Sequence, residues 1–366
     1  MFAIREMSRR KLQFGLVTGV VILIAYLVLM VTGLGLGLNQ LTGTALIGMD
    51  GDYLAYSDRS NLSVIRSQLS EAQARSIAAA PGVTASAAIG YAAAAIEYRP
   101  GEVETGALLG IDLGSIAEPA VVQGRALTSR DTHALLVDRS WVSLTGTGIG
   151  DTLQVPVGLS SEPFEIVGVV DQGSFFFQPA MFMLRDSWRG VSYRAVDQGT
   201  PYASVVLLRG DGLDGAAGSG WEVVTKDTAF WNIEGVSAQQ GTVDALRYMG
   251  LLIGAMVIGV FFYVITLQKV ALLGVLKAIG ASGLYLTVQG MLQVFLVSLT
   301  GTLIAVALAV LTKATVLSAE TVPIAFTTGA IVNTTLAVVV AGVLGAALSM
   351  RQIGAIDPII AMQQQQ

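Results

Sequence analysis

Four long apolar runs divide the chain, and one long polar region separates the first run from the other three. The runs cover residues 14–38, 245–267, 284–311 and 328–348. Each supplies the ~20 apolar residues that a helix needs to cross the hydrocarbon core of a bilayer. The pattern predicts four transmembrane helices, with a large water-soluble domain inserted between the first helix and the second.

The first run has a second interpretation, as the apolar segment of a signal peptide. Basic residues precede it, and residues 42–45 resemble a weak cleavage region. The apolar segment of a signal peptide spans only ~7–15 residues, and this run is longer. We therefore expect a transmembrane helix here.

Charge is distributed unevenly between the polar region and the rest of the chain. Residues 39–244 contain 23 acidic and 12 basic side chains, whereas the remaining residues contain 3 acidic and 9 basic ones. Basic residues favour the cytoplasmic flanks of membrane helices. The flanking basic residues are Arg5, Arg9, Arg10, Lys11, Lys269, Lys277 and Arg351. This distribution predicts that both termini are cytoplasmic and that the polar region lies outside the membrane on the other side.

The expected organisation has three parts. Residues 1–38 form a cytoplasmic segment and the first helix, and residues 39–244 form an extracytoplasmic domain. Residues 245–366 contain helices two to four and a cytoplasmic tail. The fold class is an α-helical membrane protein with a mixed α/β domain inserted between helices one and two.

Short apolar stretches bounded by glycine, proline and aspartate predict the elements of the inserted domain. We expect a helix over residues 69–80, and strands over 103–111, 134–137, 153–157, 164–170 and 200–209. Residues 175–177 are three consecutive phenylalanines. Alternation cannot place three consecutive rings on one side of a strand, so this run is either part of the core or an exposed contact surface.

Composition limits the classes of function. Of 366 residues, 13% are charged, about half the usual ~25% of soluble proteins, as in an integral membrane protein. The absence of cysteine excludes disulfides, and the single histidine, His133, excludes a multi-histidine metal cluster. No phosphate-binding G-x-x-x-x-G-K-[ST] loop occurs, no catalytic constellation is apparent, and the acidic domain does not suit nucleic acid. High alanine and glycine content with few lysines indicates a bacterial source.

The segment over residues 268–282 lies between the second and third apolar runs and has a lysine near each end. Such a segment either forms an amphipathic helix along the membrane surface or is a basic loop that only fixes topology. Gly280 suits the C-terminal cap of a helix.

This segment resembles the coupling segment of MacB/FtsX-type ABC transporter permeases. The resemblance lies in Gln268-Lys269 and in Gly274-Val-Leu-Lys-Ala-Ile-Gly-Ala-Ser282. Many members carry Glu-Ile-Gly where this chain has Leu272-Leu273-Gly274. Further similar motifs follow in order along the polar region: Pro81-Gly-Val83, Gly110-Ile-Asp112, Gly124-Arg-Ala-Leu127, Gly148-Ile-Gly-Asp151 and Ile166-Val-Gly-Val-Val-Asp171.

The resemblance implies a permease subunit in the bacterial cell membrane, without an ATP site of its own. It implies a homodimer surrounded by lipid, with an ABC ATPase that binds ATP and magnesium. The implied ATPase-coupling residues are Gln268, Lys269, Gly274, Leu276, Lys277 and Gly280. Three functions stay open: an efflux permease, an FtsX-like permease that transmits force to an extracellular partner, and an exporter of lipid, lipoprotein or peptide.

The sequence is closest to the shorter exporter branch, which includes haem-exporter permeases, so haem or a similar flat amphipathic molecule is the expected substrate. No intrinsic cofactor is expected. Methionine adapts to flat apolar ligands and can be an axial ligand of haem iron. The candidate lining residues are Met30 and Leu34 in the first helix, and Arg247, Tyr248, Met249, Leu252 and Met256 in the second. Ordinary packing between helices is the alternative for each of them.

Overall fold

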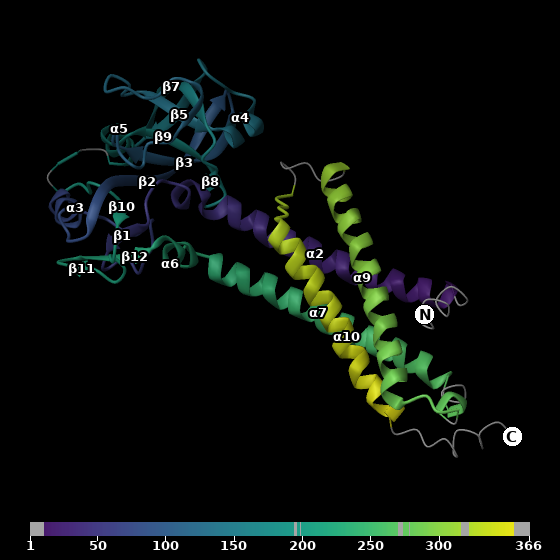
Figure 1. Ribbon diagram of the computed structural model, residues 1–366. Helices are drawn as coiled ribbons and strands as arrows, with labels where there is room; N and C mark the ends of the chain where they lie inside the picture. Colours follow the sequence, from purple (N-terminus) through teal and green to yellow (C-terminus); the bar gives the residue numbers. More distant parts are fainter. Residues whose placement is uncertain are drawn as a thin grey trace. The chain divides into compact units, whose positions relative to one another are not determined.

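The computed structural model describes residues 11–193, 196–197, 199–269, 274–277, 279–315 and 322–354 (Figure 1). The chain forms two compact units. One consists of Met1–Gly37 together with Gln240–Gln366, and the other of Leu38–Gln239. The first unit contains most of each long apolar helix, and the second contains a mixed α/β domain together with the end of the first long helix and the start of the second.

Four helices of the described chain are long and apolar enough to cross a membrane, as the hydrophobic pattern predicts. They are α2 (Lys11–Ile47), α7 (Val236–Leu267), α9 (Gly283–Thr315) and α10 (Thr328–Gly354). At ~1.5 Å per residue, α2 is about 55 Å long, well beyond the ~30 Å of a bilayer core. It continues past the predicted end because neither proline nor an acidic residue interrupts it before Ile47.

Small residues allow the backbones of α7 and α10 to touch. A Cβ atom on Gly345 would overlap the carbonyl oxygen of Ala255, and one on Gly259 would lie 2.7 Å from the carbonyl oxygen of Gly345. In a membrane, where burial of apolar surface between helices gains little, such close contacts are a main source of helix association. The pairing of α7 with α10 therefore depends on glycine at these positions.

The glycines near the end of the first apolar run also make close contacts. A Cβ atom on Gly33 would overlap the ring of Phe326, and one on Gly37 would overlap the backbone carbonyl of Pro323. These contacts hold the segment before α10 against α2. The glycines are therefore explained by this close packing.

The α/β domain contains a twelve-stranded sheet with the main strand order β11-β12-β1-β10-β2-β3-β9-β5-β7-β4 (Figure 1). The strands are β1 (Tyr53–Ser57), β2 (Val83–Arg99), β3 (Glu102–Ile111), β4 (Val121–Gly124), β5 (Ala134–Asp138), β6 (Thr152–Val157), β7 (Ser160–Val170), β8 (Ser174–Phe175), β9 (Gln178–Leu184), β10 (Val205–Gly210), β11 (Ala217–Gly218) and β12 (Trp221–Thr225). Only β3 with β9 and β5 with β7 pair in parallel among the described strands. The short helices are α3 (Glu71–Ala78), α4 (Arg139–Thr145), α5 (Arg185–Ser192) and α6 (Lys226–Trp231).

Most elements expected in the polar region are confirmed. The expected helix is α3, and four expected strands are β3, β5, β6 and β7. The prediction for residues 200–209 is wrong in its first half, because the strand begins only at Val205. Residues 200–203 lack strand structure apart from a single bridge between Leu69 and Ala203.

The longest strand, β2, follows no apolar and polar alternation in the sequence. It includes four consecutive alanines at 92–95, which by propensity favour helix. Pairing with β10 on one side and β3 on the other overrides that preference. The small residues have a packing role, because a side chain on Gly90 or Gly110 would overlap the buried ring of Trp188 in α5.

The three consecutive phenylalanines occupy three different environments. Phe175 is fully buried, and its ring meets that of Tyr91 edge to face at a centroid distance of 5.0 Å. Phe176 is partly buried against the same core, and Phe177 is 48% exposed. Phe176 and Phe177 form the two-residue turn between β8 and β9 with φ of 51° and 63°. The turn thus breaks the alternation: the start of the run belongs to the core, and Phe177 at its end is exposed, with its role as a contact surface still a prediction.

Candidate functional site

Four of the expected substrate residues lie on an exposed side of α7. Tyr248, Met249, Leu252 and Met256 are 63%, 59%, 63% and 63% exposed in the single chain. Their spacing places Met249, Leu252 and Met256 on one face of the helix, which we call the methionine stripe. An exposed apolar stripe in a membrane helix can contact lipid, a second copy of the chain or an apolar ligand.

Met30 and Leu34 have different surroundings from the methionine stripe. Both are half-buried in α2. Met30 packs beside an apolar cluster formed by α2, α9 and α10, whose buried members are Ala25, Leu29, Ala305, Ala309 and Val338. The single chain therefore places Met30 against the bundle and the methionine stripe on an open face.

Arg247 precedes the methionine stripe in α7 and is half-buried. Its guanidinium carbon lies 6.0 Å from the ring centroid of Tyr248. Its buried Nε has no hydrogen-bond acceptor. Because buried donors are almost always paired, Arg247 is a candidate for contact with an anionic group that the single chain does not supply.

A cavity between α2, α7 and α10 in the described part of the helical unit is too small for a large ligand. That cavity, beside Gly254, has a volume of only about 10 Å³. A haem-sized molecule needs a site of several hundred Å³. The open face of α7, rather than this cavity, offers room for a substrate.

The start of the coupling segment is attached to the beginning of α2. The side-chain amide of Gln13 donates to Gln268 over 3.1 Å. Lys269 is only 8% exposed, and its Nζ lies 5.8 Å from the ring centroid of Phe14. Lys269 is therefore more buried than its charge suggests, because its long apolar stem packs beside Phe14.

The second half of the coupling segment contains a helical turn that ends as the sequence predicts. Residues 274–277 are helical, with Gly274 buried and Leu276 and Lys277 half-buried. Gly280 has a φ of 105°, its N–H donates to the carbonyl of Lys277, and the next N–H donates to Leu276. This pattern is a Schellman motif, so the role of Gly280 as a helix cap is confirmed. Residues 270–273 and 278 lie outside the described residues.

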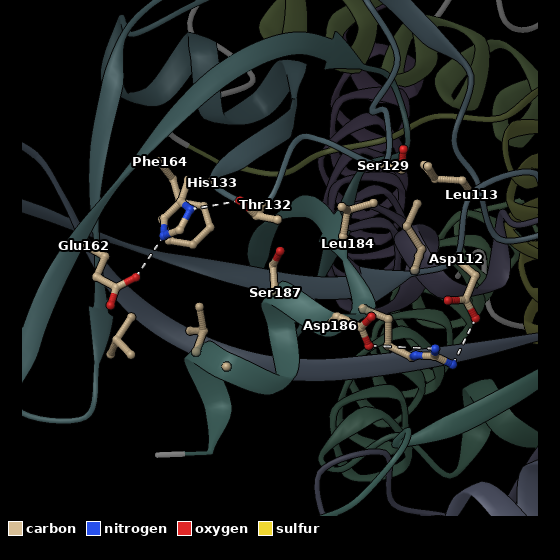
Figure 2. Close-up of a pocket in the computed structure, with 15 residues that line it drawn as sticks. Asp112, Leu113, Ser129, Thr132, His133, Glu162, Phe164, Leu184, Asp186 and Ser187 are labelled. Atoms are coloured by element: carbon tan, nitrogen blue, oxygen red, sulfur yellow. Dashed lines mark hydrogen bonds and ion pairs between the residues drawn. The ribbon is translucent and has the colours of Figure 1, made fainter. Parts of the chain in front are cut away.

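The α/β domain contains a cleft that the sequence did not reveal (Figure 2). Its volume is about 610 Å³, within the usual range for small-molecule sites. Four separated chain segments line it, within residues 111–113, 129–133, 157–164 and 184–191. The only sequence signals were the Gly110-Ile-Asp112 motif and the lone His133, and neither indicates a shared cleft.

Charged side chains line the cleft at two places (Figure 2). At one, Arg185 Nη1 lies 3.0 Å from an oxygen of Asp112, and burial raises the pKa of that carboxyl against the opposing effect of Arg185. At the other, His133 Nε2 lies 3.1 Å from Glu162. In the described part of the chain, no three His, Cys, Asp or Glu side chains are placed to hold a metal ion.

A third feature of the α/β domain is the attachment of α2 to the turn between β8 and β9. The backbone N–H groups of Phe176 and Phe177 donate to the carbonyls of Thr42 and Leu41, each over 2.9 Å. The hydroxyl of Thr44 also accepts from the N–H of Ser174 over 3.2 Å. The last turns of α2 are therefore bonded to the sheet by backbone groups.

Two family models match the chain. The MacB-like periplasmic core domain matches residues 14–229, and the FtsX-like permease C-terminal domain matches residues 246–358. The first match covers more than half of the chain. Together the two models account for the long helices and the α/β domain.

Known proteins are similar to the chain over most of its length. A permease of Staphylococcus haemolyticus, named HrtB and assigned by its name to a hemin transport system, is 22% identical over 98% of this chain and 97% of its own. An uncharacterized ABC transporter permease of Mycobacterium tuberculosis is 26% identical over 78% of this chain and 76% of its own. The periplasmic region of MacB from Actinobacillus actinomycetemcomitans aligns with 51% of this chain and 95% of its own, with 15% identity and a TM-score of 0.36.

Models of the expected family thus match both parts of the chain. The coupling motif, the order of motifs in the polar region and the four apolar helices agree with it. The chain belongs to the family of the MacB-like periplasmic core domain and is a MacB/FtsX-type ABC transporter permease.

Proposed function

We propose that the chain is the membrane subunit of an efflux pump of the bacterial cell membrane that exports haem or a similar flat amphipathic molecule. The similarity to a permease named for hemin transport supports the choice of substrate. The structural observation that carries the proposal is the methionine stripe, an open apolar face of α7 that follows Arg247.

The chemistry of the stripe suits haem. The side chains of Met249 and Met256 supply polarizable thioethers that can pack on the ring or approach its iron. Leu252 between them adds apolar surface, and apolar contact contributes ~25 cal/mol per Å² buried. Arg247, with its unpaired Nε, would hold the carboxylates, with Tyr248 beside it. Met30 and Leu34 would complete the site from α2.

The proposed working assembly is a homodimer with two copies of a separate ATPase. The stripe of one copy would face that of the other, because one face of a single helix cannot enclose a flat ligand. The ligand would enter from the outer leaflet of the membrane. In this topology both termini are cytoplasmic and the α/β domain is extracytoplasmic, as the distribution of basic residues supports.

Haem titration of the purified chain tests the proposal. We expect a Soret band with the unaltered chain, and a shifted or weaker band with Met249→Ala. Arg247→Ala should lower the affinity without moving the band. Leu303→Ala, which alters a 56% exposed residue of α9, is the matched control and should change neither property. A chain that binds no haem would refute the choice of substrate.

Co-purification with the ATPase tests the coupling segment. Lys277→Glu should weaken the association, because it reverses the charge of a half-buried side chain next to a capped helical turn. A bulky residue at the buried Gly274 should have the same effect. Membrane insertion should be unchanged in both variants. Unaltered co-purification of both would show that residues 268–282 do not bind the ATPase.

A second candidate is an FtsX-like permease that transmits force to an extracellular partner. The observation in its favour is the set of backbone hydrogen bonds between α2 and the Phe176–Phe177 turn, which would pass a movement of α2 directly to the sheet. The two candidates differ in what ATP hydrolysis by the partner would bring about. Export of haem from ATP-loaded vesicles supports the first, and ATP-dependent activation of a separate cell-wall enzyme without export supports the second.

A further inference from the structure

The cleft of the α/β domain is a concave site whose walls come from different parts of the sheet. One wall is formed by the end of β3 and the first turns of α5, and the other by the loop before β5 and the hairpin of β6 and β7. Because these elements are far apart in the sequence, only the folded domain creates the site. The volume of about 610 Å³ suits an organic molecule of ordinary drug size.

Apolar side chains line the part of the cleft between its charged groups. Phe164 and Ile111 are buried, and Leu184 and Val191 are half-buried. Figure 2 shows Leu184 and Ser187 between the His133–Glu162 pair on one side and Asp112 on the other. A ligand that lies along the cleft would therefore place an apolar body between two charged places.

Carboxylates outnumber cations along the cleft. Asp112, Asp186 and Glu162 are the acidic lining residues, and Arg185 is the basic one. With His133 neutral, the three carboxylates and the one guanidinium of Arg185 give the lining a net charge of about −2. The carboxylates are open to a ligand: the side chains of Asp112, Asp186 and Glu162 are 42%, 85% and 44% exposed.

Arg185 is held in a position that favours Asp112 over the other carboxylates of the cleft. Its side chain is only 11% exposed, and its guanidinium carbon lies 3.7 Å from the ring centroid of Tyr202. It pairs with Asp112 at 3.0 Å, whereas its nearest approach to Asp186 is 4.0 Å. Stacked on Tyr202 and paired mainly with Asp112, its single positive charge does not balance all three carboxylates, and the exposed oxygens of Asp186 and Glu162 can still accept a cationic group.

The hydrogen bonds of His133 leave acceptor positions on the Glu162 carboxylate. Thr132 Oγ lies 3.2 Å from His133 Nδ1, and Glu162 lies 3.1 Å from Nε2. The arrangement fits a tautomer in which Thr132 donates to Nδ1 and Nε2–H donates to the carboxylate. The carboxylate retains lone pairs for an ammonium or other cationic group.

We propose that this cleft binds a small organic cation with an apolar body. The apolar lining would hold the body, and Asp112, Asp186 and Glu162 would hold the charge. The site does not depend on the proposed export of haem, whose carboxylates are anionic and would be repelled here. Failure of one proposal therefore leaves the other standing.

The single histidine makes the test specific for the cleft. In the full-length chain, purified in a neutral detergent without a histidine tag and labelled with ¹³C-histidine, the imidazole signal comes from His133 alone. Tetraphenylphosphonium is the probe, and tetraphenylborate, an anion of nearly the same size and shape, is its control. We expect the cation to shift the His133 signal saturably and the anion to leave it unchanged.

Variants of the carboxylates extend the test. Asp186→Asn and Glu162→Gln should each raise the dissociation constant of the cation about fivefold, because each removes one exposed ion pair with the cation. Asp58→Asn, an exposed acid outside the cleft, is the matched control and should leave it unchanged. Asp112→Asn is less informative because it also breaks the pair with Arg185.

Three results would overturn the proposal. The first is a His133 signal that the cation does not move. The second is an equal response to tetraphenylborate, which would indicate apolar partition only. The third is unchanged affinity of both Asp186→Asn and Glu162→Gln for the cation, which would show that the carboxylates do not hold the charge.

Discussion

Replacing Asp138 by asparagine should strongly destabilise the α/β domain. Asp138 is 2% exposed and caps α4, and its carboxylate accepts four hydrogen bonds. One oxygen accepts from the N–H and the hydroxyl of Ser140, at 2.9 and 2.6 Å. The other accepts from the N–H groups of Gln172 and Gly173, each at 2.7 Å. These last two bonds fix the segment that leads into β8 and its turn.

The magnitude follows from the loss of one oxygen. The amide of asparagine has a single acceptor atom, so its NH2 group must face one of the two pairs of donors. Two partly buried donors then lose their acceptor, at ~1–3 kcal/mol each, which gives about 4 kcal/mol in total. For a domain of this size, 1 kcal/mol shifts the Tm by ~2–4 °C, so the expected decrease is about 8–16 °C.

Tryptophan fluorescence of the full-length chain in detergent is the assay. All four tryptophans, at positions 141, 188, 221 and 231, lie in the α/β domain, so the transition reports this domain and not the membrane helices. Ser140→Ala is the graded control. It removes one hydrogen bond to Asp138 and should cost only ~1 kcal/mol. A Tm of Asp138→Asn equal to that of Ser140→Ala would refute the role given to the second carboxylate oxygen.

Two further predictions follow from single contacts. Hydrogen bonds from Arg125 at 2.6 and 2.8 Å lower the pKa of Asp131 below its usual 3.8, so their stabilisation is present above about pH 4 and lost as the pH falls further. Unfolding of Arg125→Ala should therefore depend less on pH below 4 than that of the unaltered chain, and equal pH slopes would contradict this. Gly345→Val should reduce the yield of monodisperse protein in size-exclusion chromatography, because its side chain overlaps the carbonyl of Ala255. Gly329→Val, where a Cβ atom meets nothing within 4 Å, is the control, and equal losses in both would exclude a specific contact.

The sequence determined the elements whose signals are local. Four runs of ~20 or more apolar residues indicate membrane helices. A bilayer core offers no partner for backbone N–H and C=O groups, and a helix pairs these groups within itself. Caps and turn residues located α3 and four of the strands. Gly280 was identified as a cap because only glycine readily adopts its positive φ.

The coupling residues were predicted from the family resemblance, and the structure shows the surroundings of those that it describes. Lys269 shows the limit of the sequence pattern, since its charge suggests exposure and its stem is nevertheless buried near Phe14. The apolar patterns of α2 and α7 likewise did not show that Met249 is exposed and Met30 is half-buried. Which side of a membrane helix is open depends on its neighbours, and most positions in such a helix are apolar whichever way they face.

Only the tertiary structure decided the sheet and the cleft. The alanines of β2 become a strand because β10 and β3 pair with it on both sides, a long-range effect with no local signal. Phe175 and Phe177 differ in burial because a turn with two positive φ angles separates them. The cleft joins Asp112 to Glu162, 50 positions apart, through strand pairing alone. Local sequence determines periodicity and capping, whereas the convergence of distant side chains depends on which strands pair, and that is a property of the whole fold.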